Sequence, residues 1–140
     1  MRTAVDSSVL LDVLTGHPTF GPASRDALRT AYDAGALVAC EVVWAEVRAT
    51  FAGQPPFEEA MDLIGVSFDA LTAEAAALAG GLWRARRGRR PGKTGRERVV
   101  ADFLVGAHAL HQADRLLTRD EGFYRTVFAR LAVVGPASRG

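Results

Sequence analysis

Short runs of apolar residues alternate along this chain with longer stretches in which apolar residues recur at helical spacing. The short runs suit strands that are buried in a parallel sheet, and the longer stretches are typical of helices with one apolar face. No apolar run is long enough to span a bilayer, so the pattern argues against a membrane protein. The alternation therefore predicts an α/β domain.

The same pattern places the expected elements along the chain. Pro55 and Pro56 are expected to end the third helix, and Thr72 is expected to cap the helix that starts at Ala73. Strands are expected at residues 3–5, 36–39, 66–68, 115–118 and 132–134. Helices are expected at residues 7–14, 24–34, 42–47, 57–63, 73–85 and 99–113.

The size and composition of the chain fit one compact domain. Its 140 residues are enough to bury a sizeable core, and 49% of them are hydrophobic and 24% charged, as in ordinary globular proteins. We therefore expect a single domain over residues 1–140. The lone cysteine, Cys40, excludes an internal disulfide and a multi-cysteine zinc site. Because the N-terminus also lacks the apolar segment of a signal peptide, we expect a cytoplasmic protein.

One segment is strongly basic although the whole chain is nearly neutral. The formal net charge is +1, which gives no strong global field. Between residues 84 and 98, however, eight basic residues are interrupted by a single acid, Glu97. Arginine pairs well with phosphate oxygens, so Arg86 and Arg87 are candidate RNA contacts. A solvated helix end and loop is the plainer reading of this basic run, and it stays open.

Four acidic residues stand out by their places relative to the expected elements. Asp6 directly follows the first expected strand, and Asp120 closely follows the fourth. Ligands of open parallel sheets bind beyond the carboxyl ends of the strands, so both carboxylates can reach the same edge. Glu46 lies among apolar residues of the third expected helix, and Asp102 immediately precedes the apolar run 103–107. A buried charge in either place would need a partner.

Convergence of these four acids would call for a cation. The acids are spread over most of the chain, so only the fold can bring them together. Carboxylates that converge repel each other, and this repulsion raises their pKa values unless a positive charge lies among them. Oxygen ligands suit Mg²⁺ or Mn²⁺, and Mg²⁺ commonly keeps several waters and meets its substrate through phosphate oxygens. The acids therefore indicate a candidate site for a hard divalent cation.

Four segments of the chain together resemble the PIN-domain family. They are, in order, residues 5–12 (VDSSVLLD), 44–47 (WAEV), 101–109 (ADFLVGAHA) and 116–124 (LLTRDEGFY). Each motif is short, but their joint order and spacing, together with the length of the chain, resemble the VapC type of toxin within this family. The resemblance covers nearly the whole chain.

This resemblance implies a fold, a site and partners. The fold would be an α/β three-layer sandwich with a central, mostly parallel sheet flanked by helices. The site would consist of the four acids Asp6, Glu46, Asp102 and Asp120. Ser8 and Thr118 would be hydroxyl supports for this acidic cluster. The protein would be a homodimer inhibited by a cognate VapB-like antitoxin, which the basic run could bind instead of RNA.

The implied activity is that of a Mg²⁺- or Mn²⁺-dependent endoribonuclease, the toxin of a type II toxin–antitoxin system. Cleavage of a phosphodiester needs an attacking water placed in line and charge neutralised on the phosphate and the leaving oxygen, and metal ions can do both. We expect Asp6, Asp102 and Asp120 to bind metal directly or through water. Glu46 would complete the cage or orient the attacking water. Asp6→Asn should then abolish cleavage without unfolding the protein.

Other functions remain open on the residues alone. A phosphoacceptor receiver domain is also a small α/β protein with acids near strand ends, but it needs a late lysine, and the sole lysine here is Lys93. A catalytically silent PIN-like interaction module would keep the same acids. A DNA-directed nuclease would too, because an acidic site recognises phosphates and not the sugar. Taken singly, each acid could be a surface residue or a helix cap.

Several further residues are candidates for supporting or structural roles. Peripheral acidic candidates near the motifs are Asp12, Glu41 and Glu121. His108 and His111 have helical spacing but no further matching ligands, so packing or surface roles are favoured over a transition-metal pair. Trp44 and Trp83 are expected to pack in the core rather than to stack on bases.

Overall fold

The computed structural model describes residues 1–89 and 96–136, and it describes their side chains except those of residues 87–89 and 96–99. The strands are β1 (Arg2–Val5), β2 (Ala36–Ala39), β3 (Val66–Phe68), β4 (Arg115–Leu117) and β5 (Val133–Val134). They form one sheet in the order β3-β2-β1-β4-β5, and every neighbouring pair is parallel. The predicted parallel sheet is therefore confirmed.

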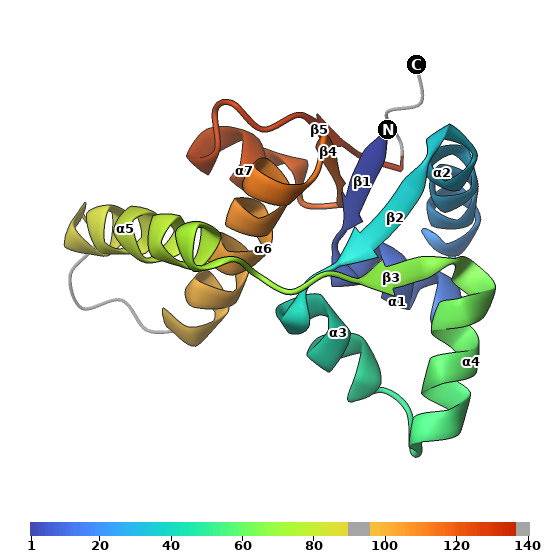
Figure 1. The fold of residues 1–140 in the computed structure, drawn as a ribbon. Helices are drawn as coiled ribbons and strands as arrows, with labels where there is room; N and C mark the ends of the chain where they lie inside the picture. Colours follow the sequence, from blue (N-terminus) through green and yellow to red (C-terminus); the bar gives the residue numbers. More distant parts are fainter. Residues whose placement is uncertain (90–95, 137–140) are drawn as a thin grey trace.

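Seven helices in the described part of the chain flank this sheet. They are α1 (Ser7–Leu14), α2 (Gly21–Ala34), α3 (Glu41–Arg48), α4 (Gln54–Ile64), α5 (Ala73–Arg89), α6 (Arg96–Gln112) and α7 (Glu121–Val127). Figure 1 shows α6 and α7 on one side of the strands and α1 and α2 on the other, while α3 lies below the carboxyl ends of β1 and β2 and α4 lies below β3. Helix α5 packs along α6. The predicted α/β sandwich is confirmed.

The direction of strand addition reverses at β1, in the middle of the sheet. Strand β1 pairs with β2 on one side and with β4 on the other, so that Ala4 lies between Val38 and Leu116. In open parallel sheets, ligands bind at such a reversal, beyond the carboxyl ends of the strands. Asp6 follows β1 and Asp120 follows β4. The topology therefore brings both acids to the place in the fold where a ligand site is expected.

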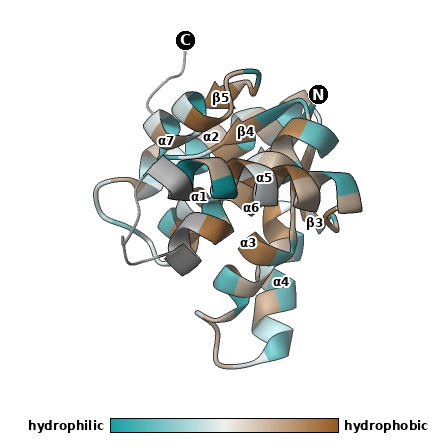
Figure 2. Cartoon of the chain, turned by 90° about the vertical axis from the view of Figure 1, so that its left-hand side faces the viewer, coloured by the Kyte–Doolittle hydropathy of each residue, from teal (hydrophilic) through white to brown (hydrophobic). Residues whose placement is uncertain are grey.

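The core fills both faces of the sheet with aliphatic and aromatic side chains. The three central strands contribute fully buried residues, among them Val5, Leu37 and Leu116. In Figure 2 the colours along α4 alternate between hydrophobic and hydrophilic, as expected of a helix with one buried face, and its buried residues are Phe57 and Met61. No helix in the described residues is both long enough and apolar enough to cross a membrane.

Two features of the helices differ from the sequence prediction. Pro55 and Pro56 do not end a helix but lie in the first turn of α4, where the missing N–H of proline has no intrahelical partner to lose. Helix α7 was not predicted, because its seven residues include Gly122 and show little periodicity. The predicted cap of α5 is confirmed, since the backbone N–H of Ala75 donates to the Thr72 hydroxyl at 3.1 Å.

Candidate active site at the carboxyl edge of the sheet

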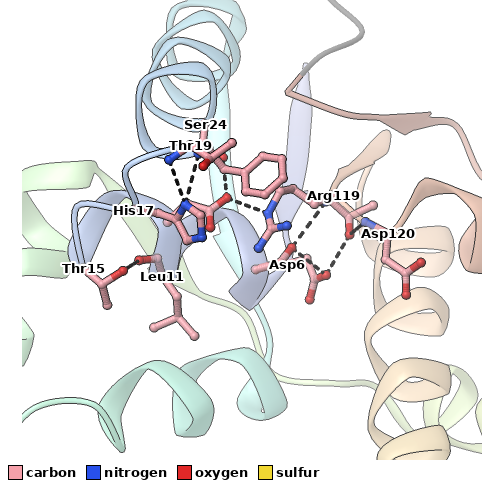
Figure 3. Close-up of polar contacts among 12 residues, drawn as sticks. Asp6, Leu11, Thr15, His17, Thr19, Ser24, Arg119 and Asp120 are labelled. Atoms are coloured by element: carbon pink, nitrogen blue, oxygen red, sulfur yellow. Dashed lines mark hydrogen bonds and ion pairs between the residues drawn. The ribbon is translucent and has the colours of Figure 1, made fainter.

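Asp6 is held in place by three hydrogen bonds to its carboxylate. Oδ1 accepts from the backbone N–H of Ser7 at 2.8 Å, which caps helix α1. Oδ2 accepts from the Ser8 hydroxyl at 3.1 Å and from the Thr118 hydroxyl at 2.7 Å (Figure 3). The structure thus places both expected hydroxyl supports against Asp6. One position on Oδ1 remains for a further partner, because a carboxylate oxygen has two lone pairs.

Thr118 links two of the four acids. Its side chain is fully buried, and its hydroxyl oxygen accepts a hydrogen bond from the backbone N–H of Asp120 at 3.0 Å while donating to Asp6. Asp120 is the residue directly before α7, and its side chain is exposed. A single buried hydroxyl group therefore fixes the spacing between the end of β1 and the turn after β4.

Glu46 reaches the site from the neighbouring helix. It lies on α3 with an exposed side chain, and its Oε1 accepts a hydrogen bond from the Ser7 hydroxyl at 2.8 Å. Ser7 therefore connects two acids, because its backbone N–H binds Asp6 while its hydroxyl binds Glu46. The sequence favours Ser7 or Ser8 as the cap of this first helix, whereas the structure gives that place to Asp6. The contact of Ser7 with Glu46 was not expected, since its position directly after Asp6 was the only available signal.

Asp102 lies in the second turn of α6 and is half-buried. The helix expected at residues 99–113 would place Asp102 in its first turn, but α6 begins at Arg96 and places it further in. Helix α6 packs against α3 and β1, the two elements that carry or precede Glu46 and Asp6. Asp102 therefore lies on a helix that packs against the elements of those two acids.

The described surroundings of Asp6 disfavour the negative charge of its carboxylate. Burial raises the pKa of Asp6, the hydrogen bonds from Thr118, Ser8 and Ser7 lower it, and the nearby negative charge of Glu46 raises it again, with a net upward shift. Desolvation of the carboxylate outweighs its three hydrogen bonds. A positive charge beside Asp6 would reverse this shift.

The negative charges of all four acids act on Tyr124, which lies on α7. Its side chain is 1% exposed, and its pKa is raised first by burial and then by the negative charges of the acidic cluster, Asp6, Asp102, Asp120 and Glu46. The phenol therefore lies within electrostatic range of all four carboxylates. Sequence analysis missed this residue, because its position one turn after Asp120 becomes evident only once α7 is known.

The four acids do not form a tight cage. Among the residues that the structure describes, no three acidic, histidine or cysteine side chains stand close enough together to hold a metal ion between them. Ser7 joins the carboxylates of Asp6 and Glu46, and Thr118 joins the Asp6 carboxylate to the backbone N–H of Asp120. All four acids act on Tyr124 at longer range. An ion at this edge would therefore need water to complete its ligand shell.

Arg119 stabilises the turn that contains Thr118 and Asp120 by forming an ion pair with Asp12. Its Nε donates to Asp12 Oδ2 at 2.7 Å, and the Ser24 hydroxyl donates to the same oxygen at 2.7 Å (Figure 3). The guanidinium group also lies 4.1 Å from the ring centroid of Phe20. Asp12 is therefore a buried ion-pair partner that joins the turn to α1 and α2.

The other candidates have structural partners. The Glu41 carboxylate accepts a hydrogen bond from the backbone of Leu71, and Glu121 forms an ion pair with Arg125 at 2.8 Å. His108 is buried and bonds Asp69 at 2.8 Å, whereas His111 is exposed. The histidines thus have the packing and surface roles that were favoured.

The two tryptophans pack against the core, and the arginine candidates belong to α5. Trp44 packs edge-on against Phe57 and Phe68, and Trp83 is half-buried against the core. Arg86 lies on α5 with a half-exposed side chain. The side chain of Arg87 falls outside the described residues.

The fold and the acidic edge together define an α/β protein of a kind seen in solved structures. The chain is similar to VapBC2 from Rickettsia felis bound to a DNA fragment from their promoter, with 16% identity, a TM-score of 0.69, and coverage of 96% of this chain and 98% of that one. It is also similar to VapBC-1 from nontypeable Haemophilus influenzae, with 16% identity, a TM-score of 0.64, and coverage of 98% and 99%. These likenesses show the fold. No curated protein sequence matches the chain significantly.

The sequence itself defines the family. The PIN domain model matches residues 3–129, which is most of the chain. The chain therefore belongs to the PIN-domain family.

Proposed function

We propose that this chain is a divalent-cation-dependent endoribonuclease that acts as the toxin of a type II toxin–antitoxin pair. The observation that carries the proposal is the hydrogen-bonded group at the carboxyl edge of the sheet, in which Ser7 joins Asp6 to Glu46 and Thr118 joins Asp6 to Asp120. This edge lies at the reversal of strand order, where ligands of parallel sheets bind. Membership of the PIN-domain family supports the same reading.

The chemistry of the site fits a hydrated Mg²⁺ or Mn²⁺ ion. All four candidate ligands are carboxylates, which are the donors that these hard cations prefer. Burial raises the pKa of Asp6, and a cation beside its carboxylate would lower that pKa again. Mg²⁺ commonly keeps several of its waters, so the carboxylates do not have to surround it closely. Asp6, Asp102, Asp120 and Glu46 would hold the ion directly or through water.

When bound, the ion would neutralise charge on the scissile phosphate and lower the pKa of a water molecule. The residues of the chain would prepare the site for this chemistry. Ser7, Ser8 and Thr118 fix the carboxylate of Asp6, so that it does not have to reorganise during the reaction. The Ser7 hydroxyl orients Glu46, which would accept a proton from the attacking water or complete the ligand set.

Cleavage of total bacterial RNA by the purified protein, free of any partner, tests this proposal. We expect discrete cuts with Mg²⁺ or Mn²⁺, no cuts with a chelator, and no cuts by a folded Asp6→Asn variant. Asp33→Asn, at an exposed position near the end of α2, is the matched control and should cut like the wild type. Products that end in a 2′,3′-cyclic phosphate would contradict water as the nucleophile. Preferential cutting of DNA would show that the protein is a DNA-directed nuclease.

A catalytically silent PIN-like interaction module is the second candidate. It is favoured by the lack of three closely spaced metal ligands among the described residues. An absence of cleavage with either ion, in a protein that is folded and still binds its partner, would establish this alternative.

We propose a VapB-like antitoxin as the protein partner and a homodimer as the assembly. The two similar solved structures named above are VapBC complexes, which supports the antitoxin. A toxin that cuts cellular RNA would act in the cytoplasm. Co-expression with a small DNA-binding protein encoded beside this chain should yield a stable complex without nuclease activity. Full cleavage by that complex would contradict inhibition at the acidic site.

A further inference from the structure

Tyr124 carries a buried hydroxyl group for which the described residues offer no hydrogen-bond partner. The side chain is almost completely enclosed. Most buried polar atoms in folded proteins have a partner, because an unpaired one loses its hydration without compensation. Exceptions commonly mark a functional group or the place of a bound ion or water. The Tyr124 hydroxyl therefore needs an explanation.

The aromatic ring of Tyr124 explains the packing of this residue but not its hydroxyl. The ring lies edge-on to Phe123 at 5.0 Å and stacks with Phe128 at 6.3 Å between centroids. Phe103 contacts both of these phenylalanines and completes the aromatic group. A fourth phenylalanine would fill the same space without burying a polar atom. The hydroxyl is thus the part of the side chain that the core does not require.

The surroundings of the hydroxyl make it a hydrogen-bond donor. Burial and the negative charges of the acidic cluster raise the pKa of Tyr124, so the phenol stays protonated. A neutral phenol among carboxylates can donate its proton to an oxygen. Asp120 lies directly before α7, and Tyr124 follows four residues later, so this helix places the phenol one turn beyond the acid.

We propose that Tyr124 is a positioning residue of the acidic cluster, whose hydroxyl donates a hydrogen bond to an oxygen ligand of a bound divalent cation and so holds that ligand in place. The inference rests on the proposed function, because it requires a cation among the four carboxylates. Without the cation the hydroxyl is an unpaired buried group that weakens the fold. With the cation bound, the same hydroxyl gains a partner and strengthens binding.

Tyr124→Phe separates these two effects, since it removes the hydroxyl and keeps the ring. In a chelating buffer the variant is expected to unfold at a higher temperature than the wild type, because an unpaired buried hydroxyl has been removed. In a titration with Mn²⁺ it is expected to bind about tenfold more weakly, as after the loss of one hydrogen bond to a charged group. With saturating Mn²⁺, kcat for RNA cleavage should fall while KM stays the same, because the enclosed hydroxyl does not touch RNA.

Tyr32→Phe is the matched control, because Tyr32 is an exposed tyrosine on α2. It should change neither the unfolding temperature nor Mn²⁺ binding. If the wild type binds Mn²⁺ and Tyr124→Phe binds it equally well, this inference alone is overturned. A lower unfolding temperature of Tyr124→Phe in chelator would also overturn it, since the hydroxyl would then have a partner in the cation-free protein. A wild type that binds no Mn²⁺ would overturn both the inference and the proposed function.

Discussion

Thr118 is the residue through which the two acids at the reversal of the sheet are joined. Its buried hydroxyl donates to Asp6 and accepts from the backbone of Asp120, so both hydrogen-bonding capacities are used. Among the hydrogen bonds that lower the pKa of Asp6 against the effect of burial, the one from this hydroxyl lowers it most. A small side chain thus supports both the charge of one acid and the position of another.

Thr118→Val tests this role, because it keeps the shape of the side chain and removes the hydroxyl. The buried carboxylate of Asp6 would lose its shortest hydrogen bond and the Asp120 N–H would lose its partner. We expect the free energy of unfolding to fall by about 1–3 kcal/mol, and RNA cleavage to fall with it. Thr118→Ser keeps the hydroxyl and should retain most of both. Equal urea unfolding curves for Thr118→Val and the wild type would show that the hydroxyl is not needed.

The place of Asp6 and Asp120 at one edge of the sheet could be predicted from the sequence, but the residues that support them only in part. Asp6 and Asp120 follow predicted strands, so the topology of a parallel sheet places them at one edge. Ser7, Arg119 and Tyr124 were missed, because each acts through a partner far away in the sequence. Such roles depend on side-chain contacts that no local pattern encodes.

Helix α6 approaches the aromatic group around Tyr124 through a glycine. A methyl group added at Gly106 would overlap the ring of Phe128. Two glycines of α5, Gly80 and Gly81, face open space instead. The helical glycines therefore affect stability in opposite ways. Gly106 permits close packing, whereas Gly80 and Gly81 only lower the stability of α5.

Gly106→Ala and Gly80→Ala should therefore shift stability in opposite directions. We expect Gly106→Ala to lower the free energy of unfolding by about 1–3 kcal/mol, because the Phe128 ring must move in a filled core. Gly80→Ala should raise it by about 0.5–1 kcal/mol through the better helix propensity of alanine. Urea unfolding of both variants measures the two effects. Stabilisation by Gly106→Ala would show that α6 and α7 are packed more loosely than described here.

Elements with a clear hydrophobic period were predictable, and those set by packing were not. Strands β2 and β3 lie at the predicted residues 36–39 and 66–68, because short apolar runs between helices have few alternatives. Helix α7 is too short for its period to be read, and it is held by the packing of Tyr124 and Phe128 in the aromatic group. The prolines of α4 were misread because the first turn of a helix tolerates them.

At the scale of the whole molecule, Asp69 ties distant parts of the chain together. It follows β3 and bonds Arg2 at the start of β1 at 3.0 Å. Its Oδ2 also forms hydrogen bonds with two side chains of α6, His108 Nε2 at 2.8 Å and Gln112 Nε2 at 2.9 Å. Burial alone would raise the pKa of Asp69, but the hydrogen bonds and charges of His108 and Arg2 lower it overall. The ionised carboxylate is thus the form that the fold stabilises.

This lowered pKa predicts how stability depends on pH. Because the pKa of Asp69 is lower in the folded protein than in the unfolded chain, its contribution is complete above the unfolded value of about 3.9 and is lost as pH falls through the folded value. The unfolding temperature of Asp69→Asn should therefore lie below that of the wild type at pH 6. The gap should shrink as the pH is lowered below 4. A gap that stays constant with pH would show that the charge of Asp69 contributes nothing.

We propose that the acids at the carboxyl edge form one divalent-cation site, and binding of Mn²⁺ to the purified protein is the direct test. Calorimetric titration of the wild type, Asp6→Asn and the surface control Asp33→Asn compares the site with an exposed acid elsewhere. We predict saturable binding by the wild type and by Asp33→Asn, and binding at least about tenfold weaker by Asp6→Asn, as expected when a charged ligand is neutralised. Equal binding by Asp6→Asn and the wild type, or no binding by any of the three, would contradict the claim.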